Sequence, residues 1–551
     1  LQITYANMKK ILLPLYFLAV TVGASAQVLS NKTSYTEADT LRGSLRPERA
    51  YDVQKYHLDV RVDPEERFLS GVNTISFKTE ASLPVMQVDL FANMKVDSII
   101  HNSESVEFSR KHNAVFVKFP SPLRENALDS IRFYFSGHPK VARNAPWDGG
   151  FVFDRDQEGN HFIAVAVQGT GASLWYPNKD HQSDEPEEVL IEAAVPNGLM
   201  NVSNGRFVGK QDLGDGYTKW SWKVNSPINN YNIVLNIANY AHFSDTYKDL
   251  DLDYYVLPYN LEKARKQFEE VKIMMDCFYE KLGPYPFEED GFKLVETPYL
   301  GMEHQSAVAY GNHYLMGYLG SDLSGTGIGM KWDYIIIHES AHEWYGNSIT
   351  AADIADMWIH ESFTSYAESI YVECRWGKEK ALEYLRGTRK GINNSSPIIG
   401  DYGVNSEGSG DMYFKGANLI NTIRSIFNDD ELWWKTLKDY TKTYRHEIIE
   451  TETTEDFFDA ATRVDLQPVF DQYLRHTALP LLQFKRTGNT YSYRWEADVV
   501  SFAMPVDIFI NGKETRLMAT DKWQKLEEEV ESQEDLKVNE LEFYITTEFV
   551  E

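Results

Sequence analysis

The segment from Tyr334 to Gly346 has the sequence YIIIHESAHEWYG and contains no helix-breaking residue before its last position. This composition predicts a helix that ends at Gly346. Residues four apart share one face of a helix, so His338 and His342 can present two imidazole nitrogens to one metal ion. Glu339 projects beside that ion, where a general base belongs. The segment therefore predicts a metal-binding helix.

A catalytic zinc ion needs a third protein ligand and keeps one position open for water. Eighteen residues separate His342 from Glu361, which lies in a second predicted helix closed by Gly377. We expect Glu361 to be the third ligand. Glu368 follows seven residues later on the same face and is expected to support a ligand from outside the coordination sphere. The pattern predicts one Zn²⁺ per chain, because imidazole and carboxylate are among its usual donors.

The regions on either side of these helices have a different periodicity. Tyr56, Leu58, Val60 and Val62 alternate with polar residues, which is typical of a half-buried strand. Similar runs recur up to about residue 245 and return after residue 476, where Asn511-Gly512 predicts a hairpin turn. We therefore expect three domains: a β domain at 49–245, a mostly helical domain at 246–476 and a small β-sandwich at 477–551.

Length and charge narrow the class of protein. A chain of 551 residues exceeds one compact core, so several domains are expected. Hydrophobic residues make up 43% of the chain, which is ordinary for a folded globular protein. A formal net charge of -28 provides no basic surface for phosphate, so we expect no nucleic-acid partner. The oligomeric state is left open.

The N-terminus resembles an export signal. Met8 and two lysines precede an apolar run, and a small-residue cleavage site ends at Ala26, so 1–26 is predicted to be a signal peptide that starts at Met8. Gln27 follows the cut where a lipid-anchored protein would carry cysteine. Residues 27–48 are expected to be a linker, and no later stretch is expected to span a membrane. We predict export to the periplasm or the medium, without a lipid anchor.

Cys277 and Cys374 are the two cysteines of the chain, and both lie in predicted helices. Export would permit a disulfide, but two cysteines make no disulfide framework. We expect two buried free thiols.

Short motifs before and after the predicted metal helix, and in both β domains, resemble those of the aminopeptidase N family of zinc peptidases. The resemblance covers about residues 49–551. The motifs are Gly301-Met302-Glu303-His304, Tyr413-Phe414-Lys415-Gly416, Leu174-Trp175-Tyr176-Pro177, Val195-Pro196, Ser203-Asn204-Gly205 and Ala503-Met504-Pro505-Val506. The implied fold is multidomain α+β, with a saddle-like N-terminal β domain, a mostly helical thermolysin-like catalytic domain and an immunoglobulin-like C-terminal β-sandwich.

The resemblance also implies roles for single residues. Glu303 would bind the α-ammonium group of a peptide, with Gly301 and Met302 beside it and Gln168 lining the same pocket. Tyr413 would donate a hydrogen bond to the oxyanion that forms during hydrolysis. The implied activity is removal of residues from the free N-terminus of peptides.

Two positions depart from the family's Gly-x-Met-Glu-Asn motif. Leu300 replaces its first glycine, which offers close backbone approach, and His304 replaces its asparagine. We expect His304 to donate a hydrogen bond that orients Glu303, and to change its charge at roughly pH 6–7.

Two other function classes remain open at this stage. A zinc endopeptidase would share the metal site but lack a residue in the role of Glu303. A non-catalytic peptide-binding protein would be expected to have lost a metal ligand or the base, whereas His338, His342, Glu361 and Glu339 are all present. The preferred first residue and the physiological peptides are not predicted by these motifs.

Overall fold

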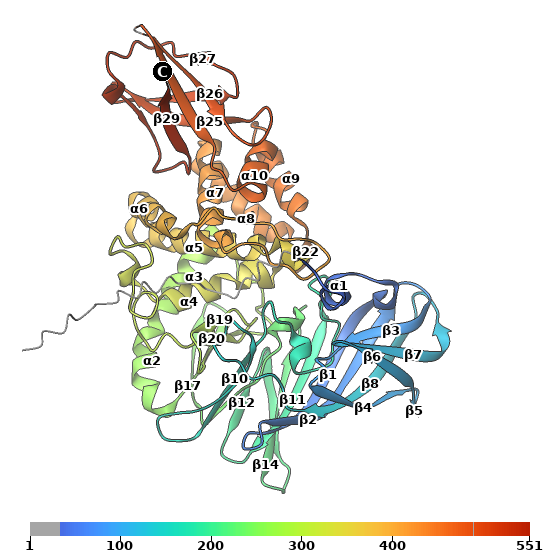
Figure 1. Ribbon diagram of the computed structural model, residues 1–551. Coiled ribbons are helices and arrows are strands. Elements are labelled where there is room, and N and C mark those ends of the chain that lie inside the picture. The colour runs from blue at the N-terminus through green and yellow to red at the C-terminus, as the bar shows by residue number, and fades with distance from the viewer. Residues whose placement is uncertain (1–33, 489, 551) are drawn as a thin grey trace, which may run out of the picture.

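The computed structural model describes residues 34–488 and 490–550. Figure 1 shows helices in the middle of the molecule, the N-terminal strands on one side of them and the C-terminal strands at the opposite end. The segment predicted to be a signal peptide, 1–26, lies outside the described residues. The layout of β, helical and β regions confirms the predicted fold class.

An eight-stranded sheet forms the frame of the N-terminal region. Its long central strand, β1 (Tyr51–Asp63), pairs antiparallel with β2 and parallel with β11. The predicted alternation is present, because Tyr56, Leu58 and Val60 are buried on one face. In spatial order the sheet contains β13 (Arg206–Asp212), β14 (Tyr217–Val224), β11 (Glu188–Pro196), β1, β2 (Phe68–Thr79), β8 (Leu128–Gly137), β4 (Met94–His101) and β5 (Glu104–Ser105).

Two smaller sheets complete this region and share its core. One contains β3 (Leu83–Asp89), β7 (Ala114–Leu123) and β6 (Glu107–Lys111). The other contains β12 (Met200–Val202), β15 (Asn236–Ala238), β10 (His161–Ala166) and β9 (Gly150–Arg155). Strand β10 matters for function, because the chain leaves it two residues before Gln168.

The middle region begins with a mixed five-stranded sheet. It contains β16 (Ala241–Tyr247), β17 (Leu250–Val256), β18 (Phe292–Glu296), β20 (Val308–Tyr310) and the short edge strand β19 (Gly301–Met302). The expected domain boundary at residue 245 falls inside β16, which pairs with β17 over its whole length. The chain therefore passes from the N-terminal sheets to the five-stranded sheet of the middle region a few residues before that boundary.

Helices fill the rest of the middle region and pack into one hydrophobic core with this sheet. They are α2 (Leu261–Gln267), α3 (Glu269–Lys281), α4 (Tyr334–Ala341), α5 (Trp358–Trp376), α6 (Lys378–Thr388), α7 (Asp411–Phe427), α8 (Asp430–Thr443), α9 (Thr451–Ala461) and α10 (Gln467–Arg475). A parallel pair, β21 (Ile349–Ala351) and β22 (Glu447–Ile449), lies among them. Over the described ranges, no helix is both long enough and apolar enough for a membrane crossing.

The C-terminal region consists of a four-stranded and a three-stranded sheet. The predicted Asn511-Gly512 turn connects two strands that pair from Ala503–Thr520 to Ile510–Lys513. The first sheet contains β27 (Gln524–Lys525), β24 (Thr490–Glu496), β23 (Leu481–Thr487) and β29 (Thr546–Val550), and the second contains β26 (Lys513–Thr520), β25 (Ala503–Ile510) and β28 (Leu536–Val538).

Part of the expected linker is a helix. Helix α1 (Glu37–Gly43) begins at Thr36, whose side chain and that of Asp39 cap each other's backbone amides. Its Leu41 is buried, and its C-terminal Gly43 lies against the backbone of residues 403–405 in the middle region. Helix α1 therefore connects the N-terminal β region with the helical region.

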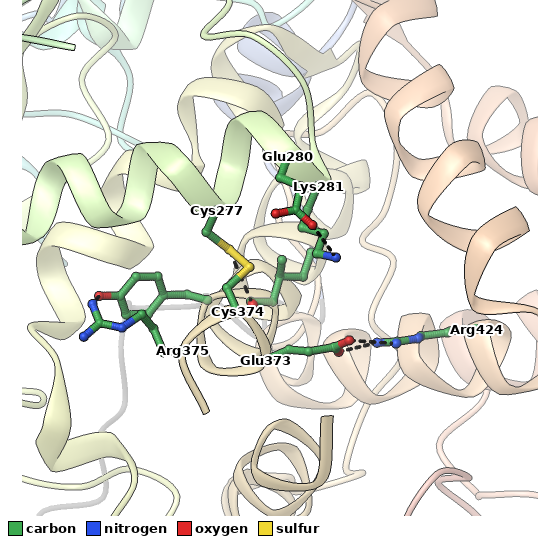
Figure 2. Close-up of a disulfide and its surroundings, with 9 residues drawn as sticks. Cys277, Glu280, Lys281, Glu373, Cys374, Arg375 and Arg424 are labelled. Carbon is green, nitrogen blue, oxygen red and sulfur yellow. Dashed lines mark hydrogen bonds and ion pairs between the residues drawn. A yellow bond between two sulfur atoms is a disulfide. The ribbon is translucent and has the colours of Figure 1, made fainter. Parts of the chain in front are cut away.

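The expectation of two free thiols was wrong. Cys277 of α3 and Cys374 of α5 form a disulfide, with their Cα atoms 5.9 Å apart (Figure 2). Both cysteines do lie on helices, as predicted, but the sequence could not show that the two helix faces meet across 97 residues. Next to the disulfide, Glu373 forms a bidentate ion pair with Arg424 of α7, at 2.6 and 3.0 Å. The C-terminal end of α5 is thus tied to a helix on each side.

We predict that the Cys277→Ser, Cys374→Ser double variant unfolds at lower denaturant concentration than the oxidised wild type. The disulfide restricts the unfolded chain over 97 residues. Its loss should lower the free energy of unfolding by about 2–4 kcal/mol. Urea unfolding of both proteins with and without a reducing agent measures this difference. The reductant should destabilise the wild type alone, and an equal response of both proteins would contradict the prediction.

Candidate metal centre

Helix α4 positions the two histidines. Its N-cap, Asp333, accepts hydrogen bonds from the backbone amides of Ile335 and Ile336, which fixes where the helix begins. Every residue of α4 is buried. The α-helix ends at Ala341 with His342 as its C-cap, earlier than the predicted end at Gly346, and a separate turn over Glu343–Asn347 follows. At Gly346 the chain turns with a φ of +116°, and a Cβ there would lie 3.2 Å from the His342 ring. The glycine predicted to end the helix therefore leaves room for His342.

Helix α5 brings the third predicted ligand to the same place. Oε2 of Glu361 lies 3.4 Å from Nε2 of His342 and 3.7 Å from Nε2 of His338. All three side chains are buried. The helix begins at Trp358 and, as the sequence predicted, ends before Gly377. The structure thus brings together two ligands from one helix and one from the next.

Hydrogen bonds fix the orientation of both imidazole rings. Nδ1 of His338 lies 2.7 Å from Oε1 of Glu368, the residue expected to support a ligand. Nδ1 of His342 lies 2.9 Å from the carbonyl oxygen of Tyr345 and 3.1 Å from the hydroxyl of Thr364. With Nδ1 occupied, each ring directs Nε2 toward Glu361.

The donor atoms fit Zn²⁺. Oε2 of Glu361 is buried and has no hydrogen-bond partner among the described residues. A buried carboxylate oxygen without a partner is costly unless a cation neutralises it. Two imidazole nitrogens face that oxygen, and two nitrogens with one oxygen form a common catalytic zinc set. His338, His342 and Glu361 would therefore hold the ion.

The ionisation of these groups also favours a bound cation. Burial acts to raise the pKa of Glu361, but His342 and His338 outweigh it and hold that pKa well below its usual value. Burial acts to lower the pKa of His338, but Glu361 and Glu368 outweigh it and raise that pKa well above 6.5. The carboxylates thus hold protons on the imidazoles when no metal is present. A metal ion would displace those protons, because it binds neutral imidazole.

The predicted base lies beside this centre. Burial raises the pKa of Glu339 to about 7, against the opposing effect of His338. A general base works best when its pKa is near the pH of the reaction. A Cβ at position 301 would lie 2.9 Å from Oε1 of Glu339 and 2.8 Å from the side chain of Ile335. Gly301 therefore lets strand β19 pack directly against the base.

Glu303 is buried near the metal ligands. Ligand atoms of Glu303, His342 and Glu361 all lie within 4.8 Å of one another. Glu303 differs from Glu361 in its bonds, because Oε1 accepts hydrogen bonds from Tyr231, at 3.0 Å, and from Nε2 of Gln168. Gln168 also approaches Glu361, at 3.5 Å. We therefore assign Glu303 to substrate binding and not to the metal.

Tyr231 is a site residue that the sequence analysis missed. It lies in the N-terminal β region, far from the other site residues along the chain, and its hydroxyl contacts Glu303. No sequence spacing relates Tyr231 to the metal-binding helix.

Met302 is predicted as a substrate contact, and its side chain is buried in the core of the N-terminal region. Leu300, which stands where the family motif has its first glycine, packs into the core of the helical region.

The expectation for His304 was wrong. No hydrogen bond joins either of its ring nitrogens to the described protein, so it does not orient Glu303 by a direct bond. Its side chain is fully buried, and burial lowers the pKa of His304 to about 3. The ring therefore stays neutral through the physiological pH range. The pH dependence expected from this substitution does not follow.

Helix α7 positions Tyr413 over the centre. Its ring stacks on that of His338 with centroids 6.2 Å apart. Burial raises the pKa of Tyr413 well above 10, so the phenol keeps its proton and can donate it in a hydrogen bond. Three residues later, a Cβ on Gly416 would lie 1.9 Å from Oγ of Ser362. The glycine of this motif thus allows α7 to approach α5.

Comparison with known proteins agrees with this geometry. Residues 259–473 match the family described as Peptidase family M1 domain. This match supports the resemblance of the helical region to the aminopeptidase N family of zinc metallopeptidases. The match contains the metal helix, the third ligand and Tyr413, and it confirms the zinc cofactor that the motifs indicated.

Similar proteins include the tricorn protease-interacting factor F2 of Thermoplasma acidophilum, 22% identical over 81% of this chain and 56% of that protein. The leucyl aminopeptidase of Saccharolobus solfataricus is 20% identical over 88% of this chain and 62% of that protein. The chain thus spans about three-fifths of the length of these curated relatives.

Solved structures share the fold. An M1 zinc metallopeptidase from Deinococcus radiodurans superimposes with a TM-score of 0.65 at 19% identity, covering 78% of this chain and 96% of that one. A variant of that protein, bound to a Tyr-Ser-Ala substrate, has a TM-score of 0.64, also at 19% identity and with the same coverage.

We predict that Glu339→Gln separates chemistry from metal binding. The Glu339 carboxylate is not one of the three converging ligands, so the variant should keep about one zinc per chain. Loss of a general base should lower peptide hydrolysis by at least about a hundredfold. Metal analysis and kinetics on the same preparation measure both effects. His342→Ala is the matched control and should lose the metal as well. Hydrolysis by Glu339→Gln within a few-fold of wild type would contradict its role as the base.

Proposed function

We propose that this protein is a zinc aminopeptidase that hydrolyses the N-terminal peptide bond of peptides. The observation that carries the proposal is the buried Glu303, held by Tyr231 and Gln168 within 4.8 Å of two metal-ligand side chains. Burial raises the pKa of Glu303, so its charged form needs a cation. The α-ammonium group of a peptide supplies that cation and fixes the first peptide bond near the metal.

Each site residue has a separate role in the hydrolysis. When bound, zinc polarises the scissile carbonyl and lowers the pKa of the attacking water. Glu339 accepts the water proton and returns it to the leaving amine. Tyr413 donates a hydrogen bond to the developing oxyanion. Glu303 and Gln168 hold the substrate's ammonium group, which orients the first residue for attack.

Two competing functions are less well supported. A zinc endopeptidase must accept a chain that continues past the ammonium site, and the buried Glu303 would then face an uncharged peptide group. A non-catalytic binding protein would not need Glu339 next to three converging ligands. The relatives named as aminopeptidases also favour the proposed reaction.

We predict that N-acetylated peptides are very poor substrates compared with the same peptides bearing a free amine. The cap removes the charge that pairs with Glu303 and leaves a buried carboxylate without a partner. Removing one side of such a pair costs about 2–5 kcal/mol. Product analysis by mass spectrometry should show stepwise trimming of free-amine peptides. Internal cleavage before terminal cleavage would favour the endopeptidase instead.

The Glu303→Gln variant provides the control for this result. It should lose most activity on free-amine peptides and leave the small residual rate on acetylated peptides nearly unchanged. A folding defect would lower both rates together. A variant that still discriminates free from acetylated peptides as wild type does would show that another group binds the ammonium.

We also propose that the protein is exported and works in the periplasm or outside the cell. The support is the signal-like sequence at 1–26 together with the Cys277–Cys374 disulfide, since disulfides persist mainly in oxidising compartments. Peptides with a free N-terminus in that compartment would be its substrates.

The mature protein is predicted to begin at Gln27, because the cleavage site ends at Ala26. N-terminal mass analysis of protein from fractionated cells of the source organism tests this. Protein found in the cytosolic fraction with the apolar segment intact would overturn the proposal.

A further inference from the structure

Glu407 is a half-buried residue that the proposed mechanism does not use. It lies in the loop between α6 and α7, six residues before Tyr413. Part of its surface remains accessible although protein surrounds it densely enough to raise its pKa to about 7. Glu407 makes no hydrogen bond or ion pair with any described residue.

The carboxylate lies next to the substrate pocket. A Cβ on Gly169 would lie 1.8 Å from Oε1 of Glu407, so that oxygen rests against the Gly169 backbone. Gly169 follows Gln168, whose amide donates to Glu303. Asn405 of the same loop approaches the Gly169 carbonyl, at 3.5 Å. Glu407 and the proposed ammonium site are therefore neighbours across one short backbone segment.

The charges around Glu407 leave it without a counter-ion. Burial is the main cause of its raised pKa, and Glu361 and Glu303 add to the rise while Arg42 opposes it. Arg42 is already engaged, because it donates to the carbonyl of Thr170 and lies 3.6 Å from Asp180. A bound zinc ion would neutralise Glu361, and the α-ammonium group of a substrate would neutralise Glu303. Glu407 remains as the unpaired anion.

We propose that Glu407 binds the side-chain cation of the substrate's first residue, so that the enzyme prefers N-terminal lysine or arginine. This inference rests on the proposed aminopeptidase function. The α-ammonium group is already held by Glu303 and Gln168, and a side chain on the same first residue is the group that can reach the adjoining carboxylate. A basic side chain pairs with Glu407, whereas an apolar one leaves it buried without a partner.

The test compares substrates that differ in this charge alone. Fluorogenic lysyl and norleucyl amides have side chains of similar length, and only lysine carries the ammonium group. The wild-type holoenzyme should favour the lysyl substrate in kcat/KM by at least about tenfold, as expected for one charge-assisted contact. Glu407→Gln should abolish that preference by slowing lysyl hydrolysis while norleucyl hydrolysis stays within a few-fold. Glu407→Asp, which keeps the charge on a shorter side chain, should retain part of the preference.

Glu431→Gln serves as the matched control, because it removes the same charge from an exposed position in the first turn of α8. It should leave the preference unchanged. Zinc content and melting temperature of each variant exclude a loss of metal or fold. Glu407 has no partner to lose, so Glu407→Gln should melt no lower than wild type.

Each outcome has one meaning. A wild-type enzyme that cleaves both amides without preferring lysine overturns the role of Glu407 and leaves the aminopeptidase function intact. An equal loss on both substrates in Glu407→Gln also overturns it, since Glu407 would then hold the α-ammonium group or support the chemistry. Cleavage of neither amide by the zinc-loaded wild type would overturn the proposed function together with this one.

Discussion

Nε2 of His338, Nε2 of His342 and Oε2 of Glu361 meet only because α4 and α5 pack closely at the centre. Small residues permit this approach, since Gly346 leaves no side chain between His342 and the ring of His360 on α5. Thr364 of α5 contacts the outer nitrogen of His342, so the second helix also orients a ligand that belongs to the first. The disulfide and the Glu373–Arg424 ion pair then hold the far end of α5 against its neighbours. The metal ligands and the base Glu339 all lie on this one helix pair.

Burying so many carboxylates is unfavourable for folding alone. Glu303, Glu339 and Glu361 lie in the same buried space, and two of them have raised pKa values because of that burial. The arrangement makes sense for a site that receives cations from outside, namely a metal ion and an ammonium group. Residues that lower stability, such as these buried carboxylates, concentrate where a protein binds its ligands.

The features that the sequence predicted depend on local spacing. Helical periodicity predicts that His338 and His342 share one face, with Glu339 beside them, and that Glu368 shares a face with Glu361. Gly377 predicts where the second helix ends. The features it missed depend on contacts between distant segments. Tyr231 reaches Glu303 from another region, and Cys277 meets Cys374 across two helices, so no periodicity could reveal either. His304 shows a third limit, because its neutral state follows from complete burial, which its neighbours in sequence do not determine.

Helix α1 has a consequence for how the protein is made. Tyr35, just before this helix, donates a hydrogen bond to Asp401, 366 residues further along the chain, and Gly43 packs on residues 403–405. On the ribosome α1 emerges before residues 401–405, so its partners there do not yet exist when it is made. Until they exist, the backbone around Gly171, which Arg42 covers, has no such cover. Helix α1 therefore reaches its native position only after the segment that contains Asp401 has been made, so this part of the fold depends on contacts between segments 366 residues apart.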